Sequence, residues 1–170
     1  SSIIDNYYYD VEKPIIIDHN RAWPGNIERI KTYINPNPKI ICTVRDILDI
    51  LTSFITLVHK NNHQVSYIDE FLLAKNKLIS DDSRCDHLMS MDGIVGQSLY
   101  VLYKSLFICH DQSYLLLVDY EDIVNNPDNT MKKIYDFLEF DYYEHDFYHI
   151  KQKITEDDTE WGLKDMHKVR

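Results

Sequence analysis

The sequence predicts an α/β fold in which a central parallel sheet lies between helices, a three-layer α/β/α arrangement. Three short apolar segments, at 13–18, 39–44 and 114–119, have the composition of strands that are buried on both faces. Segments with helical periodicity alternate with them, which is typical of a parallel sheet covered by helices. The length of 170 residues is about that of one domain, so residues 1–170 are interpreted as a single domain.

Composition and charge argue against several classes of protein. Apolar residues make up 44% of the chain, which is enough for a packed core. The formal net charge is -10 and the chain has no basic stripe, so we expect no nucleic-acid partner. There is no apolar run of about 18 residues that would suggest a membrane segment. The three cysteines have no zinc-type spacing, and their odd number favours a reducing, cytoplasmic compartment.

The first predicted strand, 13–18, is followed by a short helix. Pro24 suits the first turn of a helix, and isoleucines at helical spacing continue the pattern to about residue 34. The segment 35–38 reads Asn-Pro-Asn-Pro, which is a clear break. A strand, a helix and a break therefore precede the second strand.

The second predicted strand, 39–44, runs directly into another helix. Asp46 is placed to cap this helix, whose apolar residues recur at helical spacing as far as Val58. A further helix is predicted over 67–79. The segment 80–92 is polar and aperiodic, and we interpret it as a mobile loop that could act as a lid on the acceptor side.

The C-terminal half begins with a long predicted helix at about 93–110. The third strand, 114–119, follows it, and a turn then leads into a helix over 127–140 that Pro127 begins. The last twenty residues, 150–170, are predicted to be irregular.

Polar residues follow each predicted strand. Right-handed crossovers place the carboxyl ends of parallel strands at one edge of the sheet, and ligands of such sheets bind there. We therefore expect one polar site at this edge, made of the following residues: Asp18, His19, Asn20 and Arg21 after the first strand, Arg45 after the second, and Asp119 and Tyr120 at the end of the third.

Arg45 is the residue of this group that most suggests a ligand. It stands immediately before a helix N-terminus, where free N–H groups and the helix dipole favour an anion, and its guanidinium suits a phosphate. Ser53 lies two turns into the same helix and could donate to the same group. The alternative is that Arg45 pairs with Asp119 or Asp18 and that Ser53 is incidental.

Three ordered blocks resemble a known family. KIICTVRDILDILTSF at 39–54 resembles the 3′-phosphate-binding segment of sulfotransferases that use PAPS (3′-phosphoadenosine 5′-phosphosulfate). YLLLVDYEDIVNNPDNTMKKIYDFLEF at 114–140 and IIIDHNRAWPGNIERI at 15–30 resemble two further blocks of these enzymes. The resemblance implies a P-loop NTPase-like fold, PAPS as donor, PAP (3′-phosphoadenosine 5′-phosphate) as product, and a hydroxyl or amine of a small-molecule or carbohydrate acceptor. It implies no metal.

The resemblance also implies roles for particular residues. Arg45 and Ser53 match the arginine and serine that hold the 3′-phosphate, and Tyr120 matches the tyrosine beside the adenine. A flat aromatic face with a hydroxyl suits a purine, although a tyrosine that only packs is the alternative. In many members a basic C-terminal loop closes over the 3′-phosphate, which would be the role of Lys168 and Arg170, unless this end is simply an exposed terminus.

His19 and Arg21 are the candidate catalytic residues. Relatives tend to carry lysine in this segment, or use a nearby histidine as general base. An imidazole can accept a proton from an acceptor hydroxyl near neutral pH, and Arg21 would offer positive charge to the transferring group. The alternative is a surface histidine that hydrogen-bonds to Asp18.

The family's loop that grips the 5′-phosphosulfate, which reads like PxSGTT, is not found in the chain. We therefore expect the domain to be incomplete at its N-terminus. Two other functions stay open: a P-loop-type small-molecule kinase, and a non-catalytic nucleotide-binding or interaction module of the same fold. The sequence does not identify the acceptor or the oligomeric state.

Overall fold

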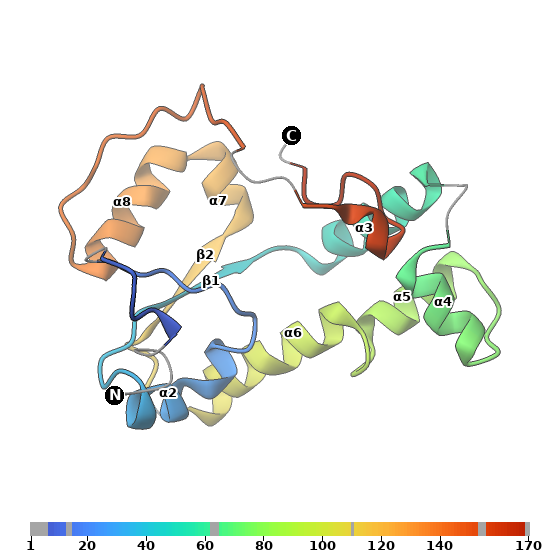
Figure 1. The fold of residues 1–170 in the computed structure, drawn as a ribbon, viewed down its shortest axis with the longest axis horizontal. Coiled ribbons are helices and arrows are strands. Elements are labelled where there is room, and N and C mark those ends of the chain that lie inside the picture. The colour runs from blue at the N-terminus through green and yellow to red at the C-terminus, as the bar shows by residue number, and fades with distance from the viewer. Residues whose placement is uncertain (1–6, 13–14, 62–64, 110, 153–155, 169–170) are drawn as a thin grey trace.

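The computed structural model describes residues 7–12, 15–61, 65–109, 111–152 and 156–168, and they form an α/β fold (Figure 1). Two parallel strands, β1 (Ile40–Val44) and β2 (Leu115–Asp119), make a small sheet with helices around it. The other elements, in chain order, are η1 (Pro24–Asn26), α2 (Ile27–Tyr33), α3 (Ile47–Lys60), α4 (Tyr67–Ala74), α5 (Asp81–Met89), α6 (Ile94–Tyr103), η2 (Lys104–Ile108), α7 (Tyr120–Asn125), α8 (Pro127–Leu138) and η3 (Asp158–Trp161).

The register of the sheet places the ends of its two strands side by side. Ile40 pairs with Leu115 at one end and Val44 with Asp119 at the other. The next residues along the chain, Arg45 and Tyr120, therefore leave the sheet at neighbouring points of its carboxyl edge. The second and third predicted strands, and the parallel pairing between them, are confirmed.

The predicted strand at 13–18 is wrong for the residues that the structure describes. Lys13 and Pro14 lie outside the described residues, and 15–18 have no regular secondary structure. Ile15, Ile16 and Ile17 are 50%, 45% and 86% exposed. β-branched residues favour a strand only when a neighbouring strand supplies hydrogen bonds and packing, and no described strand does so here.

The helix after β1 forms as predicted. The Asp46 side chain accepts hydrogen bonds from the backbone N–H groups of Leu48 and Asp49, at 2.8 and 3.4 Å, and so caps α3. The apolar face of α3 packs with Leu57 and Val58 into the main core. The cap fixes where the helix begins and therefore where Arg45 lies.

The predicted loop at 80–92 is instead largely the helix α5. Ser80 caps it by accepting a hydrogen bond from the N–H of Ser83 at 3.1 Å. Arg84 on α5 makes a two-pronged contact with Asp69 of α4, through Nε at 2.7 Å and Nη2 at 3.3 Å. These polar contacts and the fully buried Leu88 hold the helix, whose sequence has no apolar stripe, which is why hydrophobic periodicity did not reveal it.

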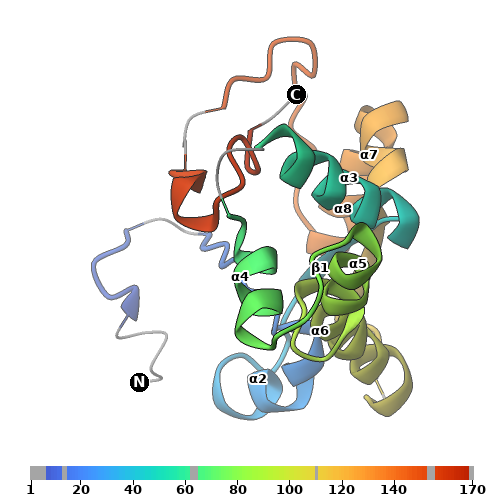
Figure 2. The ribbon, with the colours of Figure 1, turned by 90° about the vertical axis from the view of Figure 1, so that its right-hand side faces the viewer.

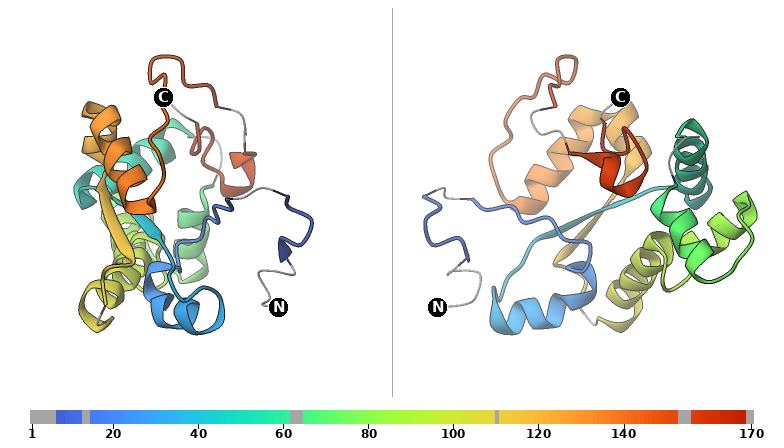
Figure 3. Two further views of the ribbon diagram at one scale, coloured as in Figure 1. Left: turned by 90° about the vertical axis from the view of Figure 1, so that its left-hand side faces the viewer. Right: turned by 45° about the vertical axis from the view of Figure 1, so that its right-hand side comes forward.

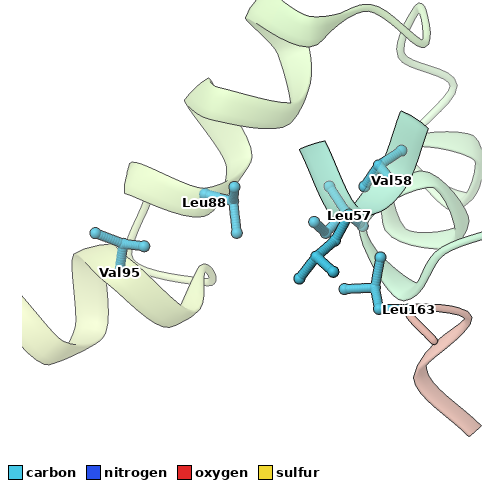
Figure 4. Packing of buried hydrophobic residues seen from close by; sticks show 6 residues of the cluster. Leu57, Val58, Leu88, Val95 and Leu163 are labelled. Atoms are coloured by element: carbon cyan, nitrogen blue, oxygen red, sulfur yellow. The ribbon is translucent and has the colours of Figure 1, made fainter. Parts of the chain in front are cut away.

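The main core lies among the helices and not against the sheet (Figure 4). It includes a residue from the C-terminal segment that was predicted to be irregular, because Leu163 is fully buried there. Gly162 precedes it with φ +60°, and a Cβ at this position would lie 2.3 Å from the Val65 carbonyl oxygen. Only glycine therefore allows this close approach of the backbone. The core consists of Leu57, Val58, Ile68, Leu88, Val95 and Leu163.

The elements divide between the two sides of the strands. α7 and α8 lie on one side, and the N-terminal segment and the segment containing η3 lie on the other (Figures 2 and 3). A smaller core of Ile27, Ile30 and Ile40 joins α2 to β1. Among the described residues, no helix combines the length and the apolar composition needed to cross a bilayer.

Candidate functional site

The carboxyl ends of β1 and β2 bring Arg45 and Tyr120 into contact. The Arg45 Cζ lies 4.4 Å from the centroid of the Tyr120 ring, which is a cation–π geometry. Tyr120 is exposed and is the first residue of α7, while Arg45 precedes α3 by two residues. The sequence therefore correctly predicted that these two residues meet at one edge of the sheet.

Most of the hydrogen-bonding capacity of Arg45 is unused. Its Nε atom is buried and has no hydrogen-bond partner among the described residues. Its Nη2 lies 3.8 Å from a carboxylate oxygen of Asp49, a long contact one helical turn further along. The side chain is 34% exposed, so solvent and ligands can reach it. A guanidinium in this state has donors left for an anion.

The alternative interpretation of Arg45, an ion pair with Asp119 or Asp18, is not found in the described structure. The Asp119 carboxylate accepts a hydrogen bond from the N–H of Glu121 at 2.8 Å. The Asp18 carboxylate accepts one from Trp23 Nε1 at 3.0 Å. Arg45 is therefore not neutralised by the two carboxylates that the sequence placed near it.

The helix N-terminus offers less to an anion than the sequence suggested. The carboxylate of Asp46 occupies the N–H groups of Leu48 and Asp49, so the guanidinium would make most of the contact. Ser53 lies on α3, is exposed, and has no side-chain hydrogen bond to another described residue. Its hydroxyl is about 10 Å further along the helix axis from the residue that follows Arg45.

His19 and Arg21 lie in the irregular segment before η1, and both are exposed. The positive charge of Arg21 acts on Tyr67, the first residue of α4. Burial raises the pKa of the Tyr67 hydroxyl, and the nearby guanidinium partly opposes that shift. The Tyr67 hydroxyl is buried without a partner in the described structure. Arg21 is therefore next to α4, and no described contact joins it or His19 to Arg45.

Lys168 lies at the opposite end of α3 from Arg45. It lines a hollow with residues of the last turn of α3, and the 14-residue helix separates its two ends by about 20 Å. This arrangement does not bring Lys168 to the same phosphate as Arg45. Arg170, the other predicted C-terminal cation, lies outside the described residues.

The hollow was not predicted from the sequence. Its volume is about 460 Å³, and it is lined by Leu57, Lys60, Asn61, Lys164, Asp165 and Lys168. The lining residues of α3 and those of the C-terminal segment are about a hundred positions apart in the sequence. They form one hollow because Leu163 packs against α3. The only sequence signal was the cationic character of the C-terminus.

One group of side chains has the composition of a metal site. Ligand-type atoms of Glu156, Asp158 and His167 lie within 4.8 Å of one another. His167 Nδ1 lies 2.5 Å from Asp158 Oδ1 and 3.3 Å from Glu156 Oε2. The backbone N–H of His167 also donates to Asp158, at 3.0 Å. These contacts tie together two turns of the C-terminal segment.

Comparison with known families decides the class of the protein. The profile of the sulfotransferase family matches residues 2–144, which is most of the chain and includes Arg45, Ser53 and Tyr120. The chain belongs to the sulfotransferase family. No curated protein and no solved structure shows a significant match. The matched region of the sulfotransferase includes the α3 side of the hollow and ends before its C-terminal side, Lys164, Asp165 and Lys168, and before the Glu156–Asp158–His167 group.

Proposed function

We propose that the protein is a PAPS-dependent sulfotransferase that moves a sulfuryl group to a hydroxyl or amine of a small-molecule or carbohydrate acceptor. Membership of the sulfotransferase family supports sulfuryl transfer in general. In this proposal the two-stranded sheet is part of the three-layer fold of P-loop type, and PAP is the product. PAPS supplies the activated sulfuryl group, and the chain's own residues bind and orient it.

One observation carries this proposal more than any other. Arg45 presents a guanidinium whose buried Nε lacks an acceptor, beside the exposed ring of Tyr120. A phosphate would accept hydrogen bonds from the accessible N–H groups of this guanidinium, and a purine would lie against the flat ring next to it. A nucleotide that carries a phosphate on its ribose offers both groups in one molecule. In the proposal Arg45 and Ser53 hold the 3′-phosphate, and Tyr120 lies beside the adenine.

The catalytic part of the proposal rests on His19 and Arg21. His19 is exposed and would take the proton of the acceptor hydroxyl as that oxygen bonds to sulfur. Arg21 would stabilise the charge on the transferring group. Since the segment 15–21 is irregular and no described hydrogen bond or ion pair joins it to Arg45, the two residues would have to approach the nucleotide when the substrates bind.

The nucleotide site is tested by calorimetric titration with PAP and with 5′-AMP. We expect PAP to bind about tenfold more tightly, because only PAP carries the 3′-phosphate that Arg45 would contact. Arg45→Ala should abolish this difference by weakening PAP binding alone. Arg29→Ala is the matched control, because Arg29 is an exposed arginine on α2 whose side chain makes no hydrogen bond or ion pair with another described residue.

Equal affinities for PAP and 5′-AMP in the unmodified protein would remove the nucleotide part of the proposal. Preference for ATP with Mg²⁺ over PAP would favour the kinase alternative instead. Binding of PAP without any transfer of labelled sulfate would favour the non-catalytic module.

The role of His19 is tested by transfer of labelled sulfate from PAPS to a panel of hydroxyl and amine acceptors. His19→Ala should reduce the turnover rate by about a hundredfold, while PAP affinity stays unchanged, because a general base acts on the acceptor and not on the nucleotide. His59→Ala serves as the control, since His59 contacts Asp81 on the surface. An unchanged rate in His19→Ala would remove His19 as the base.

A further inference from the structure

The hollow at the C-terminal end of α3 concentrates positive charge in an acidic protein. Three of its six lining residues are lysines, Lys60, Lys164 and Lys168, against a single carboxylate, Asp165. The whole chain carries a formal net charge of -10. Bringing three cations together costs some electrostatic free energy, which an anion bound between them would offset. The three lysines come from two segments that are distant in the sequence, and it is the tertiary packing that brings them together.

The lysines of the hollow are largely free of protein partners. Lys60 and Lys164 make no ion pair with any described carboxylate, and Lys168 reaches Asp165 only at 4.0 Å. Lys168 is 62% exposed in its side chain, so this contact is weak in solution. Three ammonium groups around one concave surface therefore have donors available to a ligand.

The C-terminal end of a helix normally repels an anion, but here two of the last four carbonyl groups, those of Leu57 and Val58, already accept hydrogen bonds. The backbone N–H of Asn61 donates to the carbonyl oxygens of Leu57 and Val58, at 3.2 and 3.1 Å. The Asn61 side-chain amide adds a third bond, to the Leu57 carbonyl, at 2.9 Å. These bonds weaken the partial negative charge at the end of α3. Leu57 itself lines the hollow with an apolar surface.

We infer that this hollow is a second anion site, which binds a compact dianion such as inorganic phosphate or the phosphate ester of a small sugar. Its volume of about 460 Å³ exceeds what a bare ion requires and leaves room for a small organic body. It lies about 20 Å along α3 from Arg45, so it is separate from the proposed nucleotide site. The inference does not depend on PAPS being the donor.

The inference is tested by calorimetric titration of the full chain with inorganic phosphate, at low salt in a buffer without phosphate or sulfate. We expect saturable binding with a dissociation constant below about 10 mM. The triple variant Lys60→Gln/Lys164→Gln/Lys168→Gln should lose at least about tenfold in affinity, because it removes all three cations of the site. Glucose 6-phosphate is titrated in parallel, and tighter binding than phosphate would assign the hollow to an ester.

A second triple variant controls for the change in total charge. Lys75→Gln/Lys77→Gln/Lys133→Gln removes three exposed lysines elsewhere, and we expect it to bind phosphate within about twofold of the unmodified protein. Arg45→Ala should keep the phosphate binding that Lys60, Lys164 and Lys168 provide, so a failure at the nucleotide site is distinguishable from a failure here. Equal losses in the two triple variants, or no saturable binding in the unmodified protein, would overturn the inference.

A variant that is expected to bind phosphate more tightly tests the same site, because unfolding could not produce such a gain. Asp165 has φ +63°, a left-handed conformation that asparagine adopts readily, so Asp165→Asn should fold normally. Removing the single carboxylate of the hollow should strengthen phosphate binding by about threefold. Binding that is unchanged or weaker in Asp165→Asn, measured against Asp10→Asn as an exposed control, would count against an anion in this hollow.

Discussion

The guanidinium of Arg45 lies on the ring of Tyr120, with 4.4 Å between Cζ and the ring centroid. These residues are 75 positions apart, and they meet because the register pairs the last residues of the two strands, Val44 and Asp119. The contact positions the side chain without using its hydrogen-bond donors, since a cation–π interaction involves the charge and the flat face. Arg45 is thereby oriented and still able to bind an anion.

The Tyr120 ring should matter more than its hydroxyl for nucleotide binding. Tyr120→Leu is expected to weaken PAP binding about fivefold, because it removes the face on which Arg45 lies. Tyr120→Phe keeps that face and should bind PAP within about twofold of the unmodified protein. Calorimetric titration measures both. Equal losses in the two variants would show that the hydroxyl, and not the ring, makes the important contact.

Asp46 should contribute to stability through its cap on α3. Asp46→Ala removes the acceptor of the hydrogen bonds from Leu48 and Asp49, and we expect it to lower the free energy of unfolding by about 1 kcal/mol. Asp46→Asn caps helices about equally well and should be close to neutral. Urea denaturation followed by circular dichroism gives both values. A variant with alanine that is as stable as the unmodified protein would contradict the role of the cap.

The contact between Arg84 and Asp69 is the best-shielded ion pair in the described structure. The two side chains are 14% and 10% exposed, and Arg84 also donates to Asp81 at 2.7 Å. Arg84→Ala would leave the Asp69 carboxylate in a buried position without its partner. We expect the free energy of unfolding to fall by about 3 kcal/mol.

The exposed pair of Lys132 with Asp128 provides the control for this prediction. Both side chains are 50% exposed, so Lys132→Ala should cost less than about 1 kcal/mol in urea denaturation. A double variant, Arg84→Met/Asp69→Leu, should recover much of the loss, since it leaves no unpaired charge. Similar losses for Arg84→Ala and Lys132→Ala would mean that burial does not strengthen the first pair.

The C-terminal segment should lose stability in acid because of Asp158. Hydrogen bonds from the backbone and ring of His167 hold the pKa of this carboxyl below its ordinary value. A carboxyl whose pKa is depressed in the folded state stabilises the fold above its unfolded pKa of about 3.9, and this contribution is lost as the pH falls through the folded value. Asp158→Asn removes this dependence of stability on pH.

We therefore expect the unmodified protein to be more stable than Asp158→Asn at pH 7 and to lose this advantage toward about pH 3. Urea denaturation across the pH range measures the difference. Asp157→Asn is a poor control, because Asp157 has a depressed pKa of its own, through hydrogen bonds from Thr159. Glu160→Gln is preferable, as it changes an exposed carboxylate nearby. If the free energies of unfolding of the unmodified protein and of Asp158→Asn differed by the same amount at every pH, this prediction would be contradicted.

Local patterns in the sequence predicted the elements that depend mainly on their own residues. The strands at 40–44 and 115–119 are mostly apolar, and α3 begins directly after its capping aspartate. The same patterns predicted that Arg45 and Tyr120 would lie at one edge, because parallel strands end together. Strand composition, capping and the parallel rule were sufficient for this part of the site.

Other features depended on partners that no local pattern identifies. The isoleucines at 15–17 have strand composition but no neighbouring strand among the described residues, and they are exposed. The polar segment 81–89 forms a helix that is held by the contact of Arg84 with Asp69 of α4 and by the burial of Leu88 in the main core. In both segments, interactions with distant residues outweighed the local preference.

The amino-acid sequence by itself determined the α/β class, the two paired strands and the residues that carry the likeness to sulfotransferases. Only the tertiary structure decided that Arg45 retains free donors, that Lys168 lies at the far end of α3, and that three lysines surround one hollow. The physical reason is that propensity and capping act between neighbours in the chain, whereas burial and charge pairing depend on which distant residues pack together.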